Sequence, residues 1–363
     1  MFHARMVRRP GSWQSQARSL FRLVTAALAI ALAWSPVEAG AQEITGAGAS
    51  FPAPLYTAWG QAAGSAIGVR LNYQGLTSGT GVSQVAGRTV DFGASDAPVP
   101  PQRLQAANLL QFPTVIGAVV VVVNIPGIKP NQLKLTGEII GDIYLGKISE
   151  WNDPRIVALN PDLKLLALPI VPLFRAGSSG TNFVFTSYLA AVSPAWKRHP
   201  GVGPSVHWDA GFGTRGSSNE SLSVRTLDGS IGYVGSAFAT QHHLVTVQLR
   251  NKAGRFVEPA RAAFEAAAAR ADWKNAPDFA VNLIDQDGEQ TWPMVAATFV
   301  LLPRDPKDAA SSANVIRFFD WAYSNGGKTA EDLGYLPLPA DVQDAVRQTW
   351  RAEVKRPDAK PVQ

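Results

Sequence analysis

The sequence predicts an α/β protein built from two lobes. Short runs rich in β-branched residues alternate with amphipathic helical patterns, which is typical of that class. Two strongly apolar runs, near 115–123 and 297–302, lie far apart in the sequence. If both cross between the lobes, the start of the mature chain shares a lobe with its C-terminal segment. That arrangement would place lobe I at 42–116 and 298–363, and lobe II at 117–297, and the resemblance described below is its main support.

The first 41 residues have the pattern of a cleaved signal peptide. Five arginines lie in this segment, and its apolar run, Leu20 to Trp34, is shorter than the roughly 20 residues of a membrane span. Small residues at 39–41 then offer a signal-peptidase site before Gln42. An uncleaved anchor helix is the alternative. The mature chain of 322 residues has room for two domains.

Charge and cysteine content narrow the function classes. The leader removes five arginines and one glutamate from totals of 33 basic and 28 acidic residues, leaving a mature net charge of +1. A near-neutral chain gives no indication of nucleic-acid or anionic-membrane binding. The chain has no cysteine, which excludes disulfides, thiolate metal sites and a lipid-modified N-terminal cysteine. We expect an unlipidated protein of a bacterial periplasm.

Secondary structure follows from the same patterns. The run at 115–125 has the length and Val and Ile content of a buried strand, which we expect to be parallel to its neighbours. Clusters of Gly and Pro at 199–217 and 303–307 indicate loops. The predicted strands cover 68–73, 90–93, 115–124, 170–174, 231–234 and 297–302. The predicted helices cover 54–63, 81–87, 136–145, 182–192, 309–325 and 340–354.

The first candidate ligand-binding segment is G-A-G-A-S-F-P-A-P, residues 46–54, which precedes a helical pattern. Glycines let backbone N–H groups come close to a ligand, and a helix N-terminus favours negative charge. Ser50 adds a hydroxyl at that point. An ordinary helix N-cap is the alternative.

The second segment is Y-Q-G-L-T-S-G-T-G-V, residues 73–82, followed after a short strand by Asp96 in D-F-G-A-S-D-A-P. Ser78 supplies a hydroxyl. A carboxylate suits an anion that still carries a proton, as phosphate does near neutral pH, because it accepts that hydrogen bond. Fully ionised sulfate has no proton, so it faces an unpaired like charge that costs on the order of a few kcal/mol, about a thousandfold in affinity. A turn or cap aspartate is the alternative.

The third segment is F-R-A-G-S-S-G-T-N-F-V-F-T-S-Y-L, residues 174–189, again a strand, a turn and a helix. Arg175 has a fork of donors that can hold two oxygens of one anion. Ser179 and Thr181 offer hydroxyls, and Gly180 offers an amide. Three such segments in one chain indicate an anion-binding site.

With these residues the mature chain, from Ile44 to about Val354, resembles the periplasmic phosphate-binding proteins of phosphate (Pst-type) ABC transporters. The resemblance rests on T-G-A-G-A-S-F-P-A-P, D-F-G-A-S-D-A-P, Q-F-P-T-V-I-G-A-V-V, G-D-I-Y-L-G-K-I-S-E-W, S-G-T-N-F-V-F-T-S-Y-L, F-F-D-W-A-Y and Y-L-P-L-P. It implies the type II periplasmic-binding fold, with two α/β lobes, a two-strand hinge and phosphate in the cleft. The implied phosphate ligands are Ser50, Phe51 through its backbone N–H, Ser78, Asp96, Arg175, Ser179, Gly180 and Thr181.

The third motif departs from the family pattern. That pattern has an aspartate two residues after the arginine, where this chain has Gly177. An aspartate there can pair with the arginine, so we hypothesise that affinity or anion selectivity differs here and that the site is one charge more positive. Thr77 also replaces a glycine before Ser78.

The resemblance implies a monomeric receptor for inorganic phosphate that docks on membrane permease subunits, with no nucleic-acid partner. We expect no enzyme activity, no cofactor and no metal. The alternatives are a receptor for another oxyanion such as sulfate or molybdate, and a phosphatase-like relative. A nucleotide P-loop around Lys328 and Thr329 is rejected, because Ala322 stands where that motif needs a glycine.

Overall fold

The structure is a computed structural model, and it describes residues 1–3 and 42–354. The contacts divide the chain into residues 1–41 and 42–363, and the account below concerns the second unit. The predicted signal peptide lies outside the described residues, apart from residues 1–3. Within the described part, no helix is long and apolar enough to cross a membrane.

The central element of the fold is one mixed sheet of nine strands within residues 42–354. Eight strands follow the order β2-β1-β3-β12-β4-β8-β6-β7, and β9 also pairs with β4. Their bounds are β1 Gln42–Ala49, β2 Val69–Leu76, β3 Phe92–Ser95, β4 Leu109–Val123, β6 Val171–Arg175, β7 Phe212–Thr214, β8 Ser230–Gly235, β9 Val245–Thr246 and β12 Val295–Pro303. A smaller sheet contains β5 Lys134–Leu135, β10 Gln248–Arg250 and β11 Phe256–Val257.

Strand β4 belongs to both halves of the large sheet. Its residues 109–118 pair with β12, which in turn pairs with β3 through residues 299–301. Its residues 119–123 pair instead with β8. All 15 residues of β4 are buried. The two apolar runs of the sequence thus form adjacent strands, and one of them continues from the first half of the sheet into the second.

Two expectations about β4 were wrong. It is antiparallel to β12, β8 and β9, not parallel, because its burial comes from the helices that cover the sheet and not from its direction. It also begins six residues before the predicted start. The first part of β4 was not predicted because it contains Pro113, and proline has no N–H to donate to a neighbouring strand. The pairing of β4 with β12 shifts register between Thr298 and Phe299, and this irregularity allows the proline within the strand.

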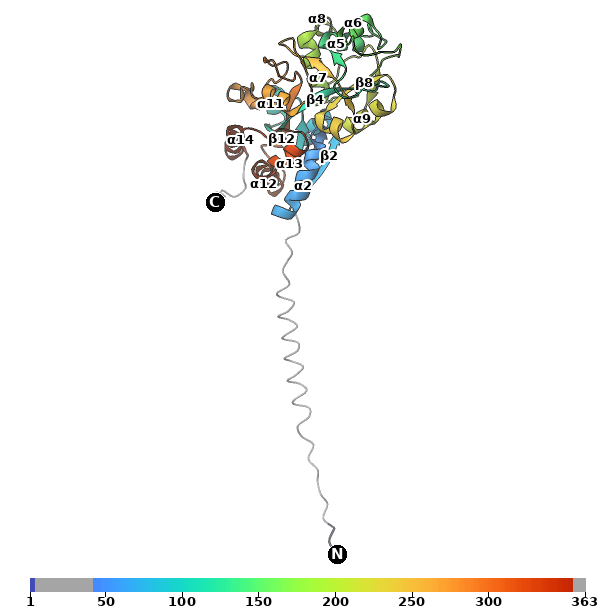
Figure 1. The fold of residues 1–363 in the computed structure, drawn as a ribbon. Coiled ribbons are helices and arrows are strands. Elements are labelled where there is room, and N and C mark those ends of the chain that lie inside the picture. The colour runs from blue at the N-terminus through green and yellow to red at the C-terminus, as the bar shows by residue number, and fades with distance from the viewer. Residues whose placement is uncertain (4–41, 355–363) are drawn as a thin grey trace. The chain divides into compact units, whose positions relative to one another are not determined.

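Groups of helices lie beside the two ends of the sheet, as Figure 1 shows for residues 42–354, while α9, α10 and α11 contact the central strand β4. Beside β1–β3 lie α2 and α12, which pack together, with α13 and α14 next to them. At the other end lie α5, α6, α7 and α8. The helix bounds are α2 Ala53–Ile67, α3 Ser78–Ala86, α4 Pro101–Ala106, α5 Gly137–Tyr144, α6 Pro154–Leu159, α7 Gly180–Val192, α8 Pro194–Arg198, α9 Gly216–Thr226, α10 Ser236–Gln241, α11 Arg261–Ala268, α12 Ala309–Asn325, α13 Gly327–Asp332 and α14 Ala340–Glu353, with short 3-10 turns at Trp273–Asn275 and Pro277–Phe279.

Each end of the sheet has a group of packed aromatic rings. Phe319 of α12 contacts the rings of Tyr56, Phe92 and Phe112 at centroid distances of 5.2 to 5.8 Å. At the other end the rings of Tyr144, Phe185, Trp208 and Tyr233 pack together. Both groups of rings belong to one continuous hydrophobic core, which runs along the sheet.

The six predicted helices and the six predicted strands are all present, within a few residues at most ends. Several further elements were not predicted, and α9 is the one among them that contributes to the site described below. Its start overlaps a segment assigned to a loop, and its sequence, G-S-S-N-E-S-L-S-V-R-T, has no wide apolar face. Its buried side is largely polar, and it includes Ser217 and Glu220.

Candidate functional site

The first predicted segment forms a tight connection between β1 and α2. β1 ends at Ala49 and α2 begins at Ala53, so Ser50 and Phe51 occupy the turn. Both are buried, with 7% and 2% of their surface exposed. The hydroxyl of Tyr335 donates a 2.6 Å hydrogen bond to the carbonyl of Phe51, which fixes this turn against the C-terminal part of the chain.

The second segment places Ser78 and Asp96 next to each other. Thr77 caps α3 by accepting a hydrogen bond from the backbone N–H of Thr80, so α3 begins at Ser78. Asp96 follows β3 directly, and its backbone N–H lies 3.4 Å from Ser78 Oγ. Thr77, which stands where a glycine was expected from the resemblance, therefore acts as the N-cap of α3.

The third segment meets the second at Gly180. The backbone N–H of Gly180 donates to Ser78 Oγ at 3.0 Å, and the N–H of Gly79 donates to the carbonyl of Ser178 at 2.9 Å. A Cβ on Gly180 would lie 2.6 Å from Ser78 Oγ and 2.7 Å from the Cβ of Asp96. A side chain at this position is therefore incompatible with the observed contact between the two segments.

Arg175 connects the third segment to the first. Its Nη2 donates to Ser50 Oγ at 2.9 Å, and its Nη1 donates to Ser217 Oγ at 3.1 Å. The backbone N–H of Ser217 also donates to Ser50 Oγ, at 3.0 Å. Asn182 holds the main chain of Arg175, because its Nδ2 donates to the Arg175 carbonyl at 2.7 Å. The guanidinium is thus fixed in a buried position between β1 and α9.

Ser217 is a site residue that sequence reasoning missed. It lies in the first turn of α9, is fully buried and contacts two of the predicted ligand residues, Ser50 and Arg175. Gly216 just before it has a φ of 76°, so the turn into α9 is another glycine and hydroxyl turn. The pattern R-G-S-S, residues 215–218, could have indicated this turn in the sequence. It differs from the three predicted segments because no apolar helical pattern follows it.

Burial perturbs the pKa values of the charged groups. It raises the pKa of Asp96 to about 7, although a 2.8 Å hydrogen bond from Thr298 Oγ1 and the nearby Arg175 oppose the change. It also lowers the pKa of Arg175, against the stabilising charges of Glu220 and Asp96. Asp96 therefore changes charge near neutral pH, which makes the electrostatics of the site depend on pH.

Hydrogen bonds join five of the eight predicted residues in two groups, Ser50 with Arg175, and Ser78 with both Asp96 and Gly180. Ser179 and Thr181 are buried in the same turn, and Ser179 caps α7 by accepting from the N–H of Asn182 at 3.4 Å. Phe51 adjoins Ser50. Within the described ranges, no group of histidines and carboxylates is arranged to hold a metal ion.

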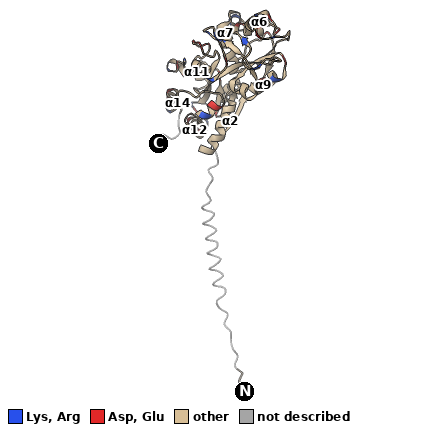
Figure 2. Cartoon of the chain, in the orientation of Figure 1, with Lys and Arg blue, Asp and Glu red and all other residues tan. Residues whose placement is uncertain are grey.

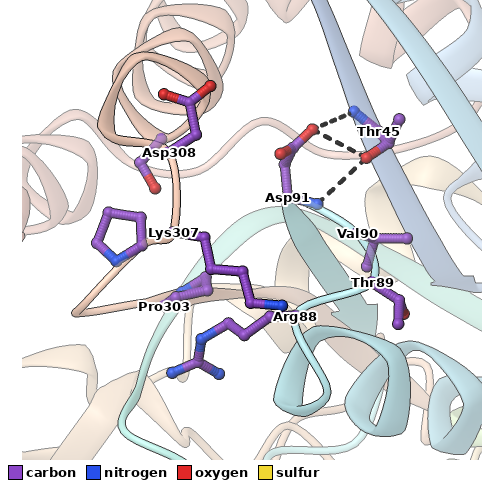
Figure 3. Close-up of a pocket in the computed structure, with 10 residues that line it drawn as sticks. Thr45, Arg88, Thr89, Val90, Asp91, Pro303, Lys307 and Asp308 are labelled. Atoms are coloured by element: carbon purple, nitrogen blue, oxygen red, sulfur yellow. Dashed lines mark hydrogen bonds between the residues drawn. The ribbon is translucent and has the colours of Figure 1, made fainter.

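A separate hollow of about 120 Å³ lies outside this site (Figure 3). There the carboxylate of Asp91 accepts hydrogen bonds from the N–H of Thr45 at 2.7 Å and from its hydroxyl at 2.9 Å. Arg88 is paired with Asp305. These contacts tie β1 to the start of β3, so we assign them a structural role. Elsewhere, charged residues of both signs occur at both ends of the sheet (Figure 2).

The class of protein follows from comparison with known families. Residues 35–325 match the PBP superfamily domain. The chain is 45% identical over 318 residues to the phosphate-binding protein PstS of Haemophilus influenzae, covering 88% of this chain and 95% of the relative. It is 43% identical over 333 residues to PstS of Pasteurella multocida, covering 92% and 97%. The chain therefore belongs to the PstS family of phosphate-binding proteins within the PBP superfamily.

Solved structures show the same fold. A phosphate-binding protein from Stenotrophomonas maltophilia has a TM-score of 0.64 at 24% identity, over 85% of this chain and 94% of the other. A putative phosphate ABC transporter substrate-binding protein from Clostridium perfringens, with bound phosphate, has a TM-score of 0.60 at 15% identity, over 82% and 100%. The fold is thus the type II periplasmic-binding fold, as the resemblance implied.

Proposed function

We propose that this protein captures inorganic phosphate between its lobes and delivers it to the membrane permease of an ABC importer. The observation that carries the proposal is the burial of Arg175 and Asp96 in one site with hydroxyl and backbone donors from three glycine-rich turns. The names of the relatives and of the structural neighbours support it.

Each predicted residue has a role in this proposal. Arg175 and the hydroxyls of Ser50, Ser78, Ser179 and Thr181 donate to phosphate oxygens, and so do the backbone N–H groups of Phe51 and Gly180. Ser78 and Gly180 lie at the first residues of α3 and α7, where free N–H groups and the helix dipole favour an anion. Asp96 accepts the hydrogen bond from the phosphate proton. Bound phosphate then satisfies donors and acceptor together.

We also propose the lobe boundaries, with lobe I at 42–116 and 298–363 and lobe II at 117–297. The change of β4 from β12 to β8 as partner, between residues 118 and 119, supports a boundary near residue 117. Opening and closing would then bend β4 and β12 near this point. Because the binding residues come from both lobes, closure and phosphate binding are coupled.

The wider setting is part of the same proposal. The protein works in the periplasm as a monomer after removal of residues 1–41, has no nucleic-acid partner and acts as a receptor without catalytic activity. Hydrolysis of a chromogenic phosphate ester by the purified protein, abolished by Arg175→Ala, would contradict the proposed absence of catalytic activity. Mass spectrometry of the exported protein should find Gln42 as its first residue.

The experiment that tests phosphate capture is calorimetric titration of the phosphate-free mature protein with phosphate and with sulfate. Micromolar or tighter binding of phosphate, with at least a tenfold loss in Arg175→Ala, is expected because the guanidinium supplies two charge-assisted hydrogen bonds. Arg198→Ala, in α8, is the matched control and should bind as the wild type does. Absence of phosphate binding in the wild type would refute the proposal.

A further inference from the structure

Glu220 is a buried acid that the proposed mechanism does not use. It lies in α9, three residues after Ser217, and both side chains are on the buried face of that helix. Glu220 is completely buried. Its Oε1 has no hydrogen-bond partner among the described residues, and the same is true of Nε of Arg175. A carboxylate is removed from water in this way only where a cation or a proton compensates for it.

The local packing fixes Glu220 beside the Arg175 strand. The hydroxyl of Thr214 donates to Glu220 Oε2, and Thr214 is the residue of β7 that pairs directly with Arg175 of β6. Gly232 of β8 leaves the space for the carboxylate, since a Cβ there would lie 2.7 Å from Glu220 Oε1. Burial raises the pKa of Glu220, and Arg175 is the group that opposes this most strongly.

The third segment itself offers no acidic partner to Arg175. Residue 177, two positions after the arginine, is a glycine, and no aspartate or glutamate occurs in residues 174–189. Gly177 has a φ of 84° and no heavy atom within 4 Å of the position of a Cβ, so nothing else occupies that place. The arginine nevertheless remains buried, with 2% of its surface exposed.

We infer that Glu220 is the countercharge of Arg175 and supplies, from a different element, the carboxylate that the third segment lacks. Glu220 is then a positioning residue. It keeps the guanidinium charged and buried between Ser50 and Ser217 before an anion arrives. The site accordingly does not carry the extra positive charge that the motif alone predicts. The significance of this pairing for phosphate rests on the proposed function, whereas the pairing itself does not.

A double-mutant cycle on phosphate-free protein tests the inference. Glu220→Gln removes the acidic neighbour that acts most strongly on Arg175 and leaves it only Asp96, and Arg175→Met removes the cation that most opposes the effect of burial on Glu220. Each single variant should lower Tm by on the order of 5 °C or more, because a buried charge without its partner is strongly destabilising. The double variant, which has neither charge, should melt higher than either single variant. The exposed pair Lys328→Met and Asp332→Asn is the control and should show additive changes.

The change in Tm caused by Glu220→Gln, measured in the wild type and in Arg175→Met, distinguishes a countercharge from a residue that only fills space. If Glu220 only fills space, its replacement will lower Tm equally in the wild type and in Arg175→Met, or unfold both, and the inference is wrong. If it is the countercharge, the replacement will lower Tm in the first background and raise it in the second. Phosphate titration of the wild type tests the proposed function separately. The proposed function and the role of Glu220 can therefore be refuted independently of each other.

Discussion

The pKa of Asp96 predicts how sulfate binding depends on pH. The carboxyl has a pKa of about 7 because of its burial, so it is largely neutral below pH 7 and charged above it. A neutral carboxyl presents no like charge to sulfate. Above pH 7, sulfate binding must be accompanied by uptake of one proton at Asp96, which costs about 1.4 kcal/mol per pH unit. Sulfate affinity should therefore fall by a factor that approaches tenfold per unit well above pH 7, or about fiftyfold from pH 7 to pH 9.

Phosphate should behave differently over the same range. Its dianion retains one proton that the charged Asp96 can accept as a hydrogen bond, so phosphate binding needs no proton uptake and its affinity should stay nearly constant. The Asp96→Asn variant cannot titrate at this position. Its sulfate affinity should be independent of pH, and its phosphate affinity should fall about tenfold or more, because a hydrogen bond to a charged group is lost.

Calorimetry at pH 7, 8 and 9 provides the measurement. Titrations in two buffers of different ionisation enthalpy give the number of protons taken up, which should approach one per sulfate at pH 8 and above. A wild-type sulfate affinity that does not change between pH 7 and pH 9 would refute the reasoning. The same slope in wild type and Asp96→Asn would assign the proton to another group. The pKa of Asp96 also limits discrimination at pH 7, where protonation relieves the charge penalty.

Three other changes have definite expected outcomes. Gly180→Ala should weaken phosphate binding at least a hundredfold, because the added Cβ lies 2.6 Å from Ser78 Oγ. The control Gly327→Ala should leave phosphate affinity unchanged, because the nearest atom to its added Cβ is 3.7 Å away. Equal affinities of the two variants would show that the second and third segments can move apart at no cost in free energy. In the Glu220→Gln background, Gly177→Asp should raise Tm above that of Gly177→Asn, which has the same shape and backbone strain without the charge; equal values would mean that residue 177 does not reach the arginine. Phe319→Ala should lower the free energy of unfolding by about 3–5 kcal/mol, measured by urea denaturation, with little change in phosphate affinity, and a loss of binding in the folded variant would contradict this.

The sequence contained most of the site because its main parts are local. In each predicted segment a strand, a glycine-rich turn and a helix follow one another within about 15 residues, so the pattern itself indicates which hydroxyls and amides lie at the turn. Asp96 was identified from the chemistry of a protonated anion. Its neighbours across the sheet, such as Thr298, were not, since only the antiparallel pairing of β12 brings them to the site.

The features that sequence reasoning missed depend on long-range packing. Ser217 and Glu220 lie in a polar helix whose buried side has no hydrophobic periodicity. A buried carboxylate cannot be distinguished from an exposed one by its neighbours in the sequence, because its partner, Arg175, comes from another element. The direction of β4 was missed for a similar reason: a fully apolar strand indicates burial, but it does not indicate which way its neighbours run.

The position of β12 has a consequence for biosynthesis. This strand, residues 295–303, lies between β3 and β4, so the strands formed by residues 42–118 lack their central neighbour until most of the chain has been made. Pairings between residues so distant in sequence also form slowly. A ribosome therefore releases the N-terminal half of this polypeptide before that half can complete its own sheet. Such a chain completes its sheet later than one whose neighbouring strands are close in sequence, so the order of its strands delays folding during synthesis.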